Sequence, residues 1–305
     1  MTEPEIRPYR REDAEPLVPF FRELLPEEVL TPPGLRHWLE EQPEQAAMQA
    51  WVADDGGEIV AFANARLRWA LAERGIGGLW VGVLPARRRR GLGAILYDQA
   101  EAHLRALNAH RSESTVRAAD SEARRFAESR GYRETRHEQQ WALDVPPSTS
   151  PRTPPEGVAV ARLGDVLDRE RELFELYDLA ERDMPDDHVH SMEYEDWRKE
   201  TLGNPELDTE LSAVVLVDGK PASFAFLISD RDGGRADNEM TGTHPEFRRR
   251  GLARLAKETT IAWAAEAGIR TISTSNDTSN ADMLALNDHL GYRPTVVKIS
   301  VGKDL

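Results

Sequence analysis

Two arginine-rich segments combine residue types that can bind an anion. They read PARRRRGLG over residues 85–93 and PEFRRRGLA over residues 245–253, each after a short apolar run and before an apolar pattern of helical spacing. The start of a helix leaves amide protons unpaired and positive in potential, and small residues allow a phosphate to approach the backbone. The shared spacing Arg-x-x-Gly-x-Gly/Ala therefore predicts a phosphate-binding loop in each segment.

Other interpretations of these loops are weaker. The segments lack the Lys-Ser/Thr ending of an ATP-binding P-loop and are not the Gly-x-Gly-x-x-Gly of dinucleotide folds. A solvated basic patch or a nucleic-acid contact would also be rich in arginine, but the formal net charge of −15 and the interrupting glycines disfavour nucleic acid. Because the pattern recurs at the same place, we favour the anion loop and expect no nucleic-acid partner.

One carboxylate is well placed for proton transfer. Glu239 lies on the expected strand just before the second loop, and a carboxylate can accept a proton from a reacting group. The simpler alternative is an exposed strand glutamate. Leu79 stands at the same distance before the first loop and cannot take a proton, so we predict that the half of the chain with the second loop is catalytic.

The chain contains an internal repeat with a spacing of 160 residues. Arg88 and Arg248, Asp120 and Asn280, and the Gly-Tyr-Arg motifs that begin at residues 131 and 291 all share this spacing, which indicates duplication of a domain. A proline-rich stretch between the copies cannot join a helix or a central strand. We therefore predict domains over residues 1–145 and 158–305, joined by a linker over residues 146–157.

The elements that must position these residues follow the same order in both copies. Alternating and continuous apolar runs predict strands, including a hairpin over residues 213–228, and apolar residues at helical spacing after each loop predict a helix. The fold class expected is α/β, with a mixed (α+β) sheet and helices on its faces in each of two tandem domains.

Composition limits the class of protein. The 305 residues are 40% hydrophobic and 30% charged, as in a globular protein, and cysteine is absent, which excludes disulfides and cysteine ligands. No run reaches the ~18 apolar residues of a membrane helix, and the acidic N-terminus is unlike a signal peptide. We expect a soluble cytoplasmic protein without a membrane partner; the oligomeric state is not indicated.

Taken together, these motifs resemble the GNAT acetyltransferase superfamily, whose acyl-CoA signature is Arg/Gln-x-x-Gly-x-Gly/Ala. The resemblance covers nearly the whole chain as two domains, and its tandem arrangement is similar to that of mycothiol synthases, although no residue selects that activity. It implies acetyl-CoA as cosubstrate and direct transfer of an acetyl group to a primary amine, on a small molecule or a peptide. The alternative is a degenerate acyl-CoA-binding sensor or scaffold without turnover.

The resemblance also implies roles for matched positions. Backbone groups of one set of residues would bind the pantetheine arm and the pyrophosphate of coenzyme A in the second copy: Thr241, Gly242, Thr243, Arg248, Arg249, Arg250, Gly251, Leu252 and Ala253. The equivalent set in the first copy is Val81, Gly82, Val83, Arg88, Arg89, Arg90, Gly91, Leu92 and Gly93.

Two catalytic assignments and one departure complete the comparison. The resemblance places Glu239 as general base and Asn280 beside the pantetheine or the acceptor, whereas a helix N-cap is the alternative role of Asn280. The tyrosine that the family often uses to protonate the thiolate is replaced by Asn287, and by Ala127 in the first copy. Asp186, Asp187, His188 and His190 could ligate a metal, but two histidines at this spacing are usually solvated, and no metal site is predicted.

Overall fold

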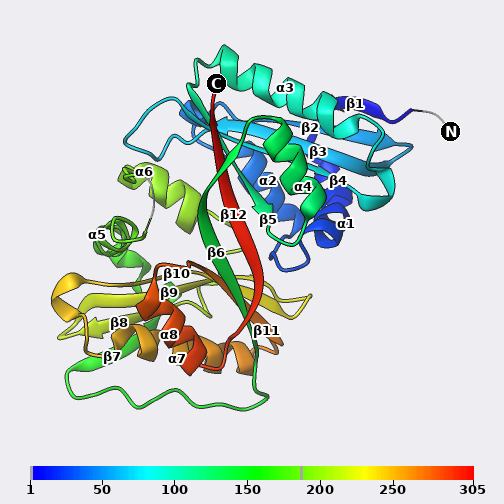
Figure 1. The fold of residues 1–305 in the computed structure, drawn as a ribbon. Helices are drawn as coiled ribbons and strands as arrows, with labels where there is room; N and C mark the ends of the chain where they lie inside the picture. The colour runs from blue at the N-terminus through cyan, green and yellow to red at the C-terminus, as the bar shows by residue number, and fades with distance from the viewer. Residues whose placement is uncertain (1–2, 186–187) are drawn as a thin grey trace. The chain divides into compact units, whose positions relative to one another are not determined.

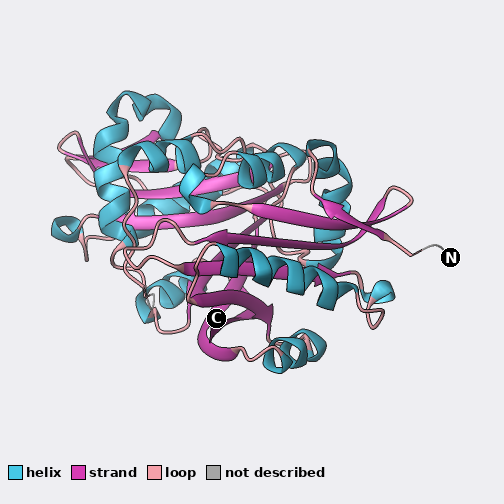
Figure 2. Ribbon diagram, turned by 90° about the horizontal axis from the view of Figure 1, so that it is seen from above, coloured by secondary structure: helices cyan, strands magenta, loops and turns pink. Residues whose placement is uncertain are grey.

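The computed structural model describes residues 3–185 and 188–305, which form two compact units (Figure 1). The N-terminal unit consists of Met1–His137 with Val297–Leu305, and the C-terminal unit of Glu138–Val296. In each unit helices lie against a mixed sheet (Figure 2), as the apolar patterns predict. The predicted α/β class with two tandem domains is confirmed.

The elements follow the same order in both halves of the sequence. The first half contains β1 (Glu5–Pro8), α1 (Ala14–Leu24), α2 (Pro32–Glu40), β2 (Gln49–Asp55), β3 (Glu58–Leu67), β4 (Ile76–Val83), α3 (Leu92–Ala106), β5 (Arg111–Arg117), α4 (Ser121–Ser129) and β6 (Arg133–Asp144). The second contains β7 (Val158–Arg162), α5 (Glu170–Glu181), α6 (Tyr194–Trp197), β8 (Ala213–Val217), β9 (Lys220–Asp230), β10 (Arg235–Thr243), α7 (Leu252–Glu266), β11 (Thr271–Asp277), α8 (Ala281–His289) and β12 (Arg293–Asp304).

The strands of the two units follow equivalent orders. The order is β1-β2-β3-β4-β5-β12 in the N-terminal unit and β7-β8-β9-β10-β11-β6 in the C-terminal unit. Within these orders β4 and β5 run parallel, as do β10 and β11, and the other pairs are antiparallel. The α3 and α7 helices are the crossovers between the parallel pairs, so each anion loop lies where a central strand leads into its crossover helix.

Each half of the sequence contributes its last strand to the unit that the other half mainly forms. The predicted domain ranges 1–145 and 158–305 do not include this exchange. Residues 298–304 of β12, red in Figure 1, pair with β5, whereas residues 138–144 of β6 pair with β11. Ile299 and Val301 are buried in the N-terminal core, and Leu143 is buried in the C-terminal core. Each edge accepts the other half's strand because both strands alternate apolar and polar residues in the same way.

Local sequence explains the elements that flank the sites. The predicted hairpin turns at Asp218 and Gly219, both with positive φ (49° and 78°), which fits a tight two-residue turn between β8 and β9. The predicted apolar stripe of α7 is buried, as Leu255 and Ala256 illustrate. The proline-rich residues 146–157 contain no helix or strand, and none of the described helices is long and apolar enough to span a membrane.

Candidate functional site

Both arginine-rich loops have the same unusual backbone. Arg89 and Arg249 have positive φ (64° and 61°), which is uncommon for a residue other than glycine, and Gly91 and Gly251 follow two residues later with φ of 85° and 76°. These glycines are the N-caps of α3 and α7, and no side chain caps either helix. The first-turn amides of each helix are therefore available to an anion, which is the arrangement that the motif predicts.

Open space surrounds the N-cap glycines. A Cβ atom added to Gly91 or to Gly251 would meet no atom of the described residues within 4 Å. The reason for glycine at both positions is the positive φ, which other residues adopt only with strain. A group the size of a phosphate can approach the backbone there without displacing a side chain.

The first arginine of each motif braces its loop. Arg88 Nε donates to the carbonyl of Val83 at 3.2 Å, and Arg248 Nε donates to the carbonyl of Thr243 at 3.2 Å. Each bond ties the loop to the end of the strand that precedes it. These guanidinium groups thus hold the loop's shape, in addition to the ligand contact that the sequence comparison implies for them.

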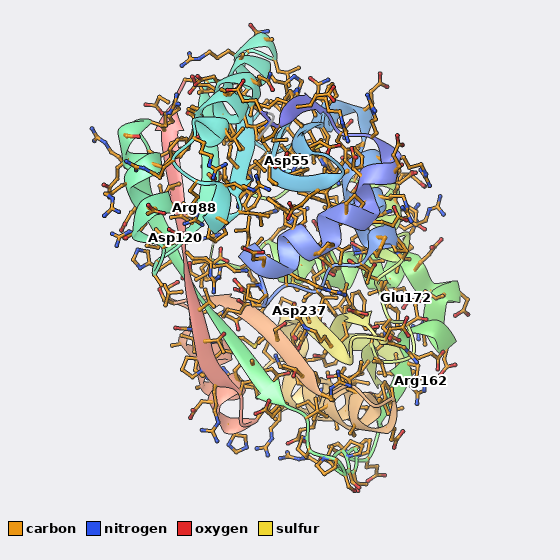
Figure 3. The ribbon with its side chains drawn as sticks, turned by 90° about the vertical axis from the view of Figure 1, so that its right-hand side faces the viewer. Asp55, Arg88, Asp120, Arg162, Glu172 and Asp237 are labelled. Carbon is orange, nitrogen blue, oxygen red and sulfur yellow. The ribbon has the colours of Figure 1, made fainter. Side chains whose placement is uncertain are left out.

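The carboxylate partners of these arginines differ between the units. Arg88 pairs with Asp120 at 3.0 Å and with Glu122 at 3.2 Å, and Figure 3 shows Arg88 and Asp120 close together. Arg248 pairs with Asp183, at the end of α5. The positive charge at the N-terminal loop is therefore offset by two carboxylates of α4 and its N-cap.

The middle arginines of the second loop remain near solvent. Arg249 is 87% exposed and reaches Asp282 at 3.3 Å, where both side chains are largely hydrated. The Arg250 guanidinium lies 5.5 Å from the centre of the Phe247 ring. Exposed pairs of this kind are weak, so Arg249 can exchange its partner for an anionic ligand at little cost.

The parallel strands separate next to each loop. Among the described residues, the pairing of β10 with β11 ends at Asp237 and Ser273, although β10 continues to Thr243. In the N-terminal unit the pairing of β4 with β5 ends at Gly78 and Glu113. Beyond these pairs the central strand forms no further backbone ladder on that side with any described strand, and an extended ligand could bond to it.

The glycines beside the loops allow close packing of the preceding helices. A Cβ atom on Gly242 would lie 2.4 Å from the Cβ of Ala180 on α5. A Cβ atom on Gly82 would lie 2.3 Å from the Trp80 ring. Thr241 and Thr243 flank Gly242, and Val81 and Val83 flank Gly82, so the predicted pantetheine-binding residues all lie at the ends of the diverging strands.

Glu239 occupies a β-bulge that has no counterpart in the N-terminal unit. On β10, Asn238 pairs with Leu227 and Met240 pairs with Phe226, which leaves Glu239 as an extra residue. The equivalent strand β4 pairs with β3 without a shift. An extra residue re-aims a side chain and increases the local twist, and bulges are frequent next to active sites.

The bulge changes which residues of β4 and β10 correspond to each other. The parallel pairs begin at Ile76 with Arg111 and at Arg235 with Thr271. The spacing between the copies is therefore 159 residues on β4 and β10 before the bulge and 160 after it. By register, Leu79 corresponds to Asn238 rather than to Glu239, and the N-terminal unit has no residue at the bulge position.

The surroundings of Glu239 make its carboxyl group a weaker acid. Water reaches the side chain, but the protein packed around the carboxyl reduces its hydration, and the charges of Asp237 and Glu206 add repulsion. Reduced hydration is the largest cause, and together these effects raise the pKa of Glu239 to about 7. Figure 3 shows Asp237 among the strands of the C-terminal unit. A base with this pKa is poised to exchange protons at neutral pH.

Tyr177 on α5 is a neighbour that sequence reasoning missed. Its ring stacks on Phe224 and Phe226 of β9, with centroids 5.8 and 6.3 Å away. Burial raises the pKa of the phenol well above its usual value, and the charges of Glu239 and Glu181 raise it further, which requires these groups to be close. Its helical spacing from Leu173 marks Tyr177 only as a core residue, and its counterpart at a spacing of 160 is Leu17, so the repeat does not mark it either.

The two asparagines of α8 have structural partners. Asn280 is the N-cap, and its side chain accepts from the Met283 amide at 3.3 Å, which matches the structural alternative for this residue. Asn287 is fully buried and donates to Asn276 Oδ1 at 2.6 Å. Among the described residues, no group of three or more His, Cys, Asp or Glu is arranged to hold a metal ion; Asp186 and Asp187 lie outside the described residues.

A family model agrees with the repeat. The model of the acetyltransferase (GNAT) family matches residues 13–132 and again residues 173–292. Both matches contain an anion loop and the diverging strands beside it. No curated protein matches the sequence closely enough to count as a relative.

Solved structures share the fold of the whole chain. A GCN5-related N-acetyltransferase from Sphaerobacter thermophilus has a TM-score of 0.72 and 22% identity, and the match covers 98% of this chain and 95% of that one. A tandem GNAT protein from the clavulanic acid biosynthesis pathway has a TM-score of 0.76 and 18% identity, with 99% and 98% covered. A putative acetyltransferase from Pyrococcus horikoshii has a TM-score of 0.61 and 13% identity, with 100% and 90% covered.

Proposed function

Because the chain belongs to the acetyltransferase (GNAT) family, we propose that its C-terminal unit transfers an acetyl group from acetyl-CoA to a primary amine. The observation that carries this proposal is the position of Glu239. It lies in a bulge at the point where β10 and β11 separate, on the strand that leads directly into the anion loop. A carboxylate in the middle of β10 and the loop that follows this strand support a proton acceptor and a phosphate site in one unit.

The residues present fit acetyl-CoA as the acyl donor. The uncapped first turn of α7 and the open space at Gly251 suit the pyrophosphate, and Arg249 supplies an exposed positive charge. The pantetheine arm would run between the diverging strands and bond to the backbone of Thr241, Gly242 and Thr243. The same backbone groups would polarise the thioester carbonyl.

The chemistry is a direct transfer in which Glu239 moves the first proton. The carboxylate of Glu239 takes a proton from the acceptor ammonium, and the neutral nitrogen attacks the thioester carbon. The nitrogen–carbon bond forms and the carbon–sulfur bond breaks. One of the two protons left on the nitrogen goes to the thiolate of coenzyme A, and the other stays on the amide. A thiol with a pKa near ~8.5 is a tolerable leaving group, so Asn287 in place of a tyrosine does not prevent the reaction.

We assign the N-terminal unit a scaffold role. Its loop has the same backbone and the same glycine N-cap, so it could hold acyl-CoA. It lacks the bulge residue, and Leu79, which corresponds by register to Asn238, is buried and apolar. Arg88 at this loop is already paired with two carboxylates.

A panel of primary amines, incubated with acetyl-CoA and the purified chain, tests the proposal. We expect coenzyme A release that depends on the amine and forms an equal amount of amide. The alternative of an acyl-CoA sensor predicts binding of acetyl-CoA without amine-dependent release across the panel. Glu266→Gln, at the exposed end of α7, is a matched control that should keep the wild-type rate.

A further inference from the structure

The side-chain amide of Asn238 forms hydrogen bonds to the strands around the bulge through both its nitrogen and its oxygen. It is 2% exposed, and its Nδ2 donates to the carbonyl of Phe226 on β9 at 3.2 Å and to the carbonyl of Met240 on β10 at 3.1 Å. Its Oδ1 accepts from Thr241 Oγ1 at 3.1 Å. The amide therefore bridges the two strands that the bulge puts out of register.

The backbone of Asn238 is held from the other side. Thr274 Oγ1 on β11 donates to the Asn238 carbonyl at 3.0 Å. This bond lies one residue beyond the last parallel pair, Asp237 with Ser273. Three strands thus fix Asn238 at the point where two of them separate.

We propose that Asn238 is a positioning residue that holds the bulge and thereby aims the Glu239 carboxylate. The effect of Asn238 on catalysis rests on the proposed function, whereas its effect on the bulge does not. Asn238 acts through Glu239 and does not itself touch the reacting atoms.

The physical reason is the strand register. A strand that loses its extra residue moves every preceding side chain to the opposite face, and a bulge persists only where something other than the regular ladder stabilises it. Here the stabilising group is a buried amide whose two donors and one acceptor are all used. The N-terminal unit has Leu79 at this register position, which offers no such bonds, and its strand is regular.

The test is a double-mutant cycle on amine acetylation. Asn238→Leu introduces the residue of the N-terminal unit, and we expect it to lower kcat/KM by about 10²-fold while changing the KM for acetyl-CoA little. In a Glu239→Gln background the same change should lower kcat/KM by less than about threefold, because the aimed group is already lost. Equal losses in both backgrounds would show that Asn238 supports the fold without positioning Glu239.

A second readout does not depend on turnover. The Glu239 carboxyl, identified in ¹³C NMR spectra by its absence from Glu239→Gln, should titrate near 7 in the wild type. In Asn238→Leu the midpoint should move toward the ordinary value of about 4.3 as the side chain leaves its surroundings. An unchanged midpoint in a folded variant overturns the proposal, even if no amine is ever acetylated. If Glu239→Gln is fully active but the midpoint moves, the bulge inference stands and the proposed base fails.

Two further variants separate positioning from stability. Asn64→Leu replaces a buried strand asparagine of the N-terminal unit and should leave both readouts unchanged. Asn238→Leu combined with deletion of Glu239 recreates the regular register of β4, so it should fold and be inactive. If Asn238→Leu alone does not fold, Asn238→Thr, whose hydroxyl cannot reach both carbonyls, replaces it in the cycle and in the titration.

Discussion

At the scale of single residues, the proposed proton transfer depends on the protonation state of Glu239. A base acts only when deprotonated, so kcat/KM should rise with pH through the pKa of about 7. Glu239→Gln keeps the shape but cannot take a proton. We expect it to lower kcat/KM by about 10²-fold or more at neutral pH and to abolish the inflection near 7.

The pH–rate profile checks this expectation. Raising the pH should recover part of the rate of Glu239→Gln, because more of the amine is then already neutral. A profile of Glu239→Gln that overlays the wild type with the true acceptor would remove Glu239 from the mechanism.

A second residue links burial to stability. Lys257 on α7 is 1% exposed, its ammonium lies 5.0 Å from the centre of the Tyr292 ring, and burial lowers its pKa to about 7. The unfolded chain binds this proton up to pH ~10.4, whereas the folded chain binds it only below about 7. The fold therefore gains stability as the pH rises between these values.

Lys257→Met should remove this penalty. We expect its melting temperature to exceed that of the wild type by several degrees at pH 7 and below, with a gain that shrinks toward pH 10. Thermal melts of both proteins from pH 6 to 10 measure this difference in melting temperature. A difference that stays constant over this range would mean that Lys257 titrates normally in the fold.

Residue-scale prediction from the sequence succeeded where the signal was local. The arginine-glycine loops could be predicted because strand, loop and helix follow one another within a few residues. The bulge could not be predicted, because the spacing between the copies is again 160 directly after the extra residue. Aligning the copies at that single spacing does not reveal an insertion. Tyr177 and the role of Asn238 were missed because both depend on contacts across strands and helices.

At the scale of elements, the exchange of final strands sets which unit each strand stabilises. Ile299 pairs with Val116 of β5, and Leu143 pairs with Ile272 of β11. Truncating such a buried side chain to alanine typically costs about 2–5 kcal/mol. Ile299→Ala should therefore weaken the N-terminal unit, and Leu143→Ala the C-terminal unit.

Hydrogen exchange of the two variants distinguishes the assignments. The amides of β5 should lose protection in Ile299→Ala, and those of β11 should lose it in Leu143→Ala. The opposite pattern would mean that each half of the sequence keeps its own last strand.

The sequence could not predict this exchange. Alternation of apolar residues in β6 and β12 predicts an edge strand in both cases, and the two edges that receive them arise from the same repeat. Only the pairing partners distinguish a strand that returns to its own half from one that crosses to the other.

At the scale of the whole molecule, we propose that the duplication separates two tasks. Both units keep the loop that suits a phosphate, and within the described part of the chain only the C-terminal unit has a carboxylate in a bulge beside it. The repeat and its loops follow from the sequence, and so does the predicted division of labour. The structural reason for that division, an inserted residue in one strand, follows only from the register.

The most direct test of this division is a matched set of glutamate substitutions, assayed for acetyl-CoA turnover. Gly251→Glu places a carboxylate in the space proposed for phosphate, and Gly91→Glu does the same in the N-terminal unit. Gly268→Glu, at the other end of α7, has a similar positive φ and open surroundings, so it controls for backbone strain. We predict that Gly251→Glu abolishes turnover and that folded Gly91→Glu and Gly268→Glu keep most of it. Loss of turnover in a well-folded Gly91→Glu, with Gly251→Glu still active, would contradict the account.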